Sequence, residues 1–89
     1  MQILANLSHE ETIYVYDLIE KKFALENLEL CLPELDDKKD LYIKCKVEKE
    51  ETERRYDQWW DSMIEKYQLQ NYPYENLVVD AIAETIQLA

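Results

Sequence analysis

The sequence predicts a mainly α-helical protein, built as a long antiparallel hairpin of two helices over about 8–30 and 34–68. The chain has no glycine and only two prolines, so it lacks the residues that most often interrupt helices. Apolar residues recur at three- and four-residue steps, and lysine, arginine and glutamate alternate at four-residue spacing over 46–55. We expect residues 1–89 to form a single small helical domain.

The first helix is predicted to begin after Ser8. The Ser8 hydroxyl and the Glu11 carboxylate have the spacing of a capping box, in which each side chain accepts a hydrogen bond from the other residue's amide. Two adjacent apolar stripes follow. The first stripe contains Ile13, Tyr16, Ile19, Phe23 and Leu30; the second contains Val15, Leu18, Leu25, Leu28 and Leu32. So broad an apolar face predicts more than one packing partner.

The second helix is predicted to follow Leu32-Pro33, because proline lacks an amide proton and disfavours the helical conformation in the residue before it. Its apolar positions keep an approximate heptad spacing, interrupted by Lys49. These positions are Leu35, Tyr42, Cys45, Thr52, Tyr56, Trp59, Met63 and Tyr67. A tight turn between the helices would place Phe23 near Tyr42 in the core and Ser8 near Asp57.

Trp59 and Trp60 lie about 100° apart around the second helix, so they cannot both face the first helix. One is expected to pack in the hairpin. The other faces either a third element of the chain or a partner protein. We expect the two termini, residues 1–7 and 72–89, to meet at this aromatic end and cover it.

Residues 77–88 have two interpretations. Val78, Ala81, Ile82, Thr85 and Ile86 form an apolar helical face, whereas the many β-branched residues also suit strands. Because no Asn-Gly or Asp-Gly turn is present, we predict a short C-terminal helix packed on the end of the hairpin. The alternative is a C-terminal β-hairpin that turns near 82–84 and pairs with residues 2–5.

The sequence offers few residues for catalysis. His9 is the sole histidine and belongs to no metal-binding motif, and the absence of glycine argues against phosphate-binding loops. Cys31 and Cys45 lack metal-ligand spacing and are predicted to be reduced thiols that fill small apolar spaces. We therefore expect no catalytic residue, no metal and no cofactor, and we predict that the protein is not an enzyme.

Twenty acidic residues against ten basic ones give a net charge of −10, which opposes direct binding to nucleic acid. No segment approaches the roughly 20 apolar residues that span a membrane, and the opening residues do not resemble a signal peptide. These features predict a soluble, cytoplasmic protein without membrane contact.

Two segments together resemble a known group of proteins. They contain Glu20, Lys21, Lys22, Ala24, Leu25, Glu26, Asn27 and Leu28, then Trp59, Trp60, Met63, Lys66 and Tyr67. The pattern is similar to small accessory proteins of CXXX-repeat peptide modification systems in anaerobic bacteria, and it covers about a fifth of the chain. The resemblance implies an accessory protein that works beside a radical peptide-modifying enzyme, with no active-site residues.

The predicted function is a non-enzymatic protein-interaction module, which could also pair with a second copy into a four-helix bundle. The residues predicted to bind the partner are Trp60, Trp59, Tyr56, Leu18 and Leu25. The alternative is an acidic protein that imitates nucleic acid and inhibits a DNA- or RNA-binding enzyme, since a compact anionic domain can occupy a basic groove.

Overall fold

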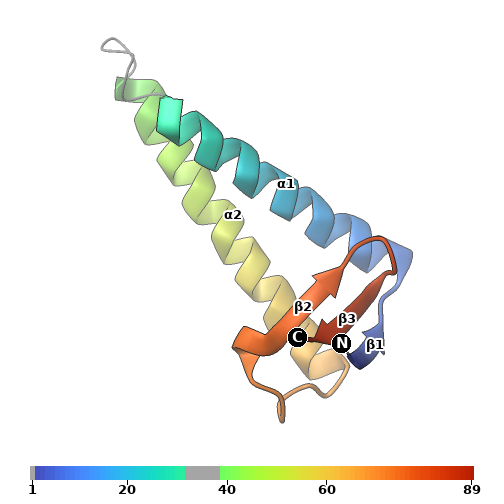
Figure 1. Cartoon of the computed structure of the whole chain (residues 1–89). Coiled ribbons are helices and arrows are strands. Elements are labelled where there is room, and N and C mark those ends of the chain that lie inside the picture. Colours follow the sequence, from blue (N-terminus) through green and yellow to red (C-terminus); the bar gives the residue numbers. More distant parts are fainter. Residues whose placement is uncertain (1, 32–38) are drawn as a thin grey trace.

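The computed structural model describes residues 2–31 and 39–89. Two long helices, α1 (His9–Cys31) and α2 (Lys39–Lys66), pack side by side and run antiparallel (Figure 1). The predicted mainly helical hairpin is therefore confirmed. The Leu32-Pro33 break and the predicted helix start near residue 34 lie outside the described residues.

The first turn of α1 is fixed by the predicted capping box. The Ser8 amide donates to Glu11 Oε1 at 2.8 Å, and the Glu11 amide donates to Ser8 Oγ at 3.1 Å. The Thr12 hydroxyl also donates to the Ser8 carbonyl at 2.9 Å. These bonds satisfy amides that have no partner within the helix, so α1 begins at a defined residue.

Three residues of the second stripe face the interior, whereas Leu28 is 42% exposed and Leu32 lies outside the described residues. Val15, Leu18 and Leu25 are buried, and Leu25 packs on Cys45. The Cys45 thiol donates to the Leu25 carbonyl at 3.4 Å, which agrees with its predicted role as a small buried thiol. Lys49, which interrupts the heptad spacing, forms an ion pair with Glu29 of α1 at 3.0 Å.

The predicted register between the helices is wrong. Lys66 and Tyr67 reach Glu11 in the first turn of α1, where the prediction placed Asp57 opposite Ser8. Under that prediction Arg54 would lie opposite Glu11, and Arg54 is twelve residues, or about 18 Å, from Lys66 along α2. The prediction assumed a tight turn at Pro33, whereas the register follows the buried contacts of the second stripe and of Glu11.

The prediction that Phe23 packs against Tyr42 in the core is also wrong, because it depended on the same register. Phe23 is 60% exposed and Tyr42 is 36% exposed. Leu25, two residues further along α1, takes the buried place.

A three-stranded antiparallel sheet covers the end of the hairpin where α1 begins and α2 ends (Figure 1). Its strands are β1 (Gln2–Asn6), β2 (Leu77–Asp80) and β3 (Thr85–Leu88), in the order β1-β3-β2. The register pairs Gln2 with Leu88 across β1 and β3, and Leu77 with Leu88 across β2 and β3. The two termini therefore lie together, as predicted (Figure 1).

The predicted short C-terminal helix is wrong, and the alternative β-hairpin paired with residues 2–5 is confirmed. Asp80 begins the turn over 81–84: its Oδ1 accepts hydrogen bonds from the amides of Ile82 and Ala83, both at 3.0 Å. Glu84 has a left-handed backbone, with φ of 54°, at a position that glycine often occupies. Asp80 and Glu84 thus form the turn without an Asn-Gly or Asp-Gly pair.

Both tryptophans lie in the core beneath the sheet. Their rings contact edge to face, with centroids 5.0 Å apart. The two ends of the chain and the segment after α2 cover them, with Val15 of α1 and Met63 of α2 at the side. The covering buried residues are Ala5, Leu7, Leu69, Leu77 and Ile86.

Candidate interaction surface

The residues predicted to bind a partner lie inside the molecule. Four of them are less than one-tenth exposed, namely Trp60, Trp59, Leu18 and Leu25. The fifth, Tyr56, is half-buried. Trp60 makes edge-to-face contacts with Tyr56 and Tyr74 as well as with Trp59. Sheet and helix packing within the chain already covers most of the surface of these side chains, so the apolar surface left exposed lies elsewhere.

The first apolar stripe of α1 lies on the outside instead. Ile13 is 47% exposed, Tyr16 45%, Phe23 60% and Leu30 75%. We call these four residues the α1 stripe. Ile19 lies half-buried beside it. Since α2 packs against the second stripe, the α1 stripe is an apolar strip of surface along most of one helix.

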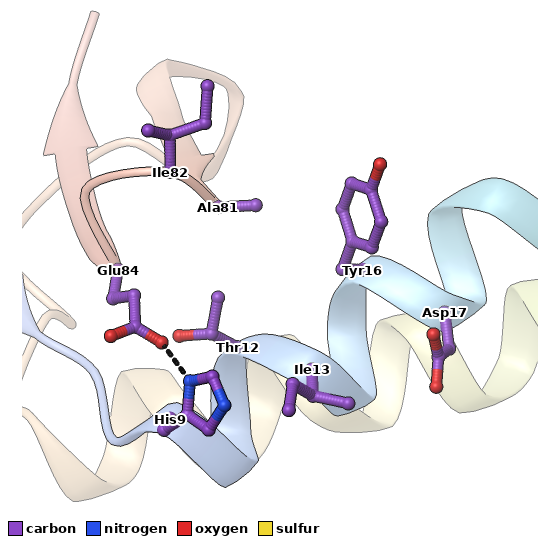
Figure 2. A pocket seen from close by; sticks show the side chains of 8 residues that line it. All are labelled: His9, Thr12, Ile13, Tyr16, Asp17, Ala81, Ile82 and Glu84. Atoms are coloured by element: carbon purple, nitrogen blue, oxygen red, sulfur yellow. Dashed lines mark hydrogen bonds and ion pairs between the residues drawn. The ribbon is translucent and has the colours of Figure 1, made fainter.

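A groove of about 290 Å³ adjoins the N-terminal end of the α1 stripe. We call it the turn groove. Figure 2 shows the β2–β3 turn opposite the first turns of α1, with Tyr16 rising on the side that faces Ala81. The lining residues are His9, Thr12, Ile13, Tyr16, Asp17, Ala81, Ile82 and Glu84. The groove and the stripe share Ile13 and Tyr16, so they form one continuous surface.

The turn beside the groove is held in place by several bonds. His9 Nδ1 lies 2.7 Å from Glu84 Oε2 (Figure 2), and the Leu7 amide donates to the Glu84 carbonyl at 2.8 Å. Asp80 holds the turn from inside, as described above. This ordered turn presents Ile82, which is 98% exposed. An apolar side chain so exposed on a bonded turn is well placed to contact another molecule.

The surface around Tyr16 is negatively charged. A hydrogen bond to the Glu20 carboxylate and the negative charges of Glu20 and Asp17 raise the pKa of Tyr16 above its ordinary value. Within residues 2–31 and 39–89, neither Asp17 nor Glu20 forms an ion pair. The candidate surface therefore combines an apolar strip with carboxylates that no cation of the described chain neutralises.

Comparisons with known proteins were made in three ways. No protein-family model, curated protein or solved structure matches this chain. In the described ranges, no three histidine, cysteine, aspartate or glutamate side chains are grouped so that they could hold a metal ion. None of the described helices combines the length and the hydropathy needed to cross a membrane.

Sequence analysis found the α1 stripe as a pattern but assigned Phe23 to the core. It did not identify Ile82 as an exposed contact residue. The available signal was Asp80, since aspartate at the first position of a turn accepts hydrogen bonds from amides that follow it.

Proposed function

We propose that this protein is a non-enzymatic protein-interaction module, which binds its partner on the α1 stripe and the turn groove. The observation that supports the proposal most is the exposure of the α1 stripe, between 45% and 75% for each of its four side chains. Exposed apolar side chains that continue along one face of a soluble domain are typical of protein-binding sites.

Several contacts hold the elements that carry the surface in place. The capping box fixes the start of α1, the Glu29–Lys49 ion pair ties α1 to α2, and the tryptophan core supports the sheet that bears the turn. A preorganised surface loses little conformational entropy when it binds, which favours affinity. These supports are consistent with a docking scaffold.

The experiment that tests the proposal is affinity capture from a lysate of the source organism with two matched variants. Phe23→Asp places a charge in the α1 stripe, and Ile43→Asp places one on α2; both side chains are 60% exposed. We expect Phe23→Asp to lose the partners that the unmodified protein captures, while Ile43→Asp retains them. Circular dichroism of each variant verifies that it is folded.

Equal capture by Phe23→Asp and the unmodified protein would contradict the proposal. Loss of capture only with Ile43→Asp would move the interface to α2.

The resemblance to accessory proteins of peptide modification systems suggests which partner to test first. On this proposal the protein is cytoplasmic and works beside a radical peptide-modifying enzyme, so the captured protein is that enzyme or its substrate peptide. Mass spectrometry of the captured material identifies it. A partner of another class would leave the interaction module in place and reject this assignment.

A nucleic-acid mimic is the second candidate, and one observation favours it. Asp57, Asp61 and Glu65 follow one another at four-residue spacing on α2, all exposed and outside the ion pairs of the described chain. A row of carboxylates can occupy a basic groove. This candidate predicts capture of a DNA- or RNA-binding enzyme that falls steeply as salt rises and does not depend on Phe23.

A further inference from the structure

The spacing of the α1 stripe matches a helical partner. Tyr16, Phe23 and Leu30 are seven residues apart, and Ile19 lies between the first two at the intermediate position. Residues repeated every seven positions stay on one line along a helix, which is the pattern by which two helices pack side by side. From Ile13 to Leu30 the stripe is about 25 Å long, so a helix of about 17 residues would cover it.

The charge beside the stripe restricts what that helix contains. Asp17 and Glu20 flank Tyr16 and have no ion-pair partner among the described residues. Two copies of this chain are poorly matched there. If two α1 stripes paired antiparallel about their centre, the Glu20 side chains of the two copies would lie on the same side of the contact and within about one helical turn of each other. Like charges that are brought together oppose association.

We infer that the α1 stripe binds an amphipathic helix whose apolar side is flanked by lysine or arginine. This inference rests on the proposed function and specifies its partner. Apolar side chains of the partner helix pack on Phe23 and Leu30, and its cations lie beside Asp17 and Glu20. The mode is that of a helix that binds along an apolar surface through residues spaced three, four and seven apart.

The turn groove receives one end of this helix. Its volume of about 290 Å³ is at the lower limit for a small-molecule site, and it opens directly onto the stripe. One large apolar side chain of the partner can enter between Tyr16 and Ala81, with Ile82 against its outer side. The groove thereby sets where along the α1 stripe the helix begins.

Fluorescence anisotropy with synthetic peptides tests the inference on the full chain. The probe is a labelled helical peptide of about 17 residues with leucine at the heptad positions and lysine beside them. One control peptide has glutamate in place of every lysine, and a second has the composition of the lysine peptide in scrambled order. We expect the lysine peptide to bind at least about tenfold more tightly than either control.

Variants of the chain separate the apolar contribution from the charged one. Phe23→Asp should weaken binding of the lysine peptide at least about tenfold, and the Asp17→Asn/Glu20→Gln double variant should weaken it severalfold and reduce its salt dependence. Ile43→Asp, the matched control on α2, should bind as the unmodified chain does.

Three results would overturn the inference. The first is equal binding of the lysine, glutamate and scrambled peptides, and the second is unchanged binding by the Asp17→Asn/Glu20→Gln variant. The third is a dimer, measured by analytical ultracentrifugation, that Phe23→Asp converts to a monomer, because the occupant would then be a second copy. If capture from the lysate still depends on Phe23 while the lysine peptide fails, the inference is wrong and the proposed function stands.

Discussion

Glu11 is the residue that bonds the start of α1 to the end of α2. Its carboxylate accepts hydrogen bonds from Lys66 Nζ at 2.7 Å, from the Tyr67 hydroxyl at 2.6 Å and from the Ser8 amide at 2.8 Å. Burial alone would raise the pKa of Glu11, but these hydrogen bonds outweigh it and lower the pKa to about 2. The ionised form is therefore the one that the fold stabilises.

Because the pKa of Glu11 is lower in the folded state than its ordinary value of 4.5, its contribution to stability is complete above pH 4.5. It is lost as the pH falls from there to about 2. We expect Glu11→Gln to reduce the free energy of unfolding by about 1–3 kcal/mol at pH 7. Urea denaturation at several pH values should show this difference shrinking toward pH 2; a constant difference would contradict the assignment.

Gln68, two residues after the end of α2, has a left-handed backbone with φ of 57°. The Leu69 amide donates to the Ile64 carbonyl at 2.9 Å across this residue, which closes the helix. Glycine adopts such a conformation without steric cost, although it also gains freedom in the unfolded chain. We expect Gln68→Gly to raise the free energy of unfolding by about 0.5–1 kcal/mol, measured by urea denaturation.

Glu84→Gly is the matched comparison for that substitution. Glu84 has a similar φ of 54°, but its side chain also pairs with His9. Glu84→Gly should therefore raise the free energy of unfolding by less than Gln68→Gly does, because it also removes the pairing with His9. A larger gain at Glu84 would show that the left-handed backbone of Gln68 costs little.

At the scale of elements, the two stripes of α1 should differ in their effect on stability. Leu18 is 8% exposed and faces the interior, whereas Phe23 is 60% exposed. We expect Leu18→Ala to reduce the free energy of unfolding by about 2–4 kcal/mol and Phe23→Ala to change it by less than about 1 kcal/mol. Thermal or urea denaturation measures both, and the reverse order would reject the observed packing of α1.

Periodicity predicted both long helices, and the capping box predicted the start of α1. Periodicity could not decide which apolar stripe of α1 packs against α2, because both stripes have helical spacing and similar apolar character. That choice depends on the register, which Leu25, Cys45 and Glu11 set through contacts distant in sequence. The C-terminal strands were harder to predict, because their pairing with β1 is also a contact between distant residues.

At the scale of the whole molecule, a net charge of −10 on 89 residues produces repulsion within the folded chain. Salt screens this repulsion over about 10 Å at 0.1 M ionic strength. We expect the melting temperature to rise as sodium chloride is increased from about 10 to 200 mM. A falling melting temperature would show that the ion pairs, such as Glu29–Lys49, outweigh the repulsion.

The candidate surface was only partly predictable from the sequence, because it too depends on contacts between residues distant in the chain. Sequence analysis recognised that α1 has more apolar residues than one partner can cover, and the exposed α1 stripe is that excess. The turn groove could not be foreseen, since it exists only where strand pairing carries the turn over 81–84 onto α1. The buried tryptophans were predicted to be covered by the termini, and they are.

The order of strands in the sheet also has a consequence for how the protein folds. β3 is the central strand, yet it comes last among the described elements in chain order, whereas β1 comes first. Contacts between such distant segments form late, because closing a long loop has a large entropic cost. The helices can therefore form before the sheet, while the aromatic core stays open to solvent until β3 has paired with both β1 and β2.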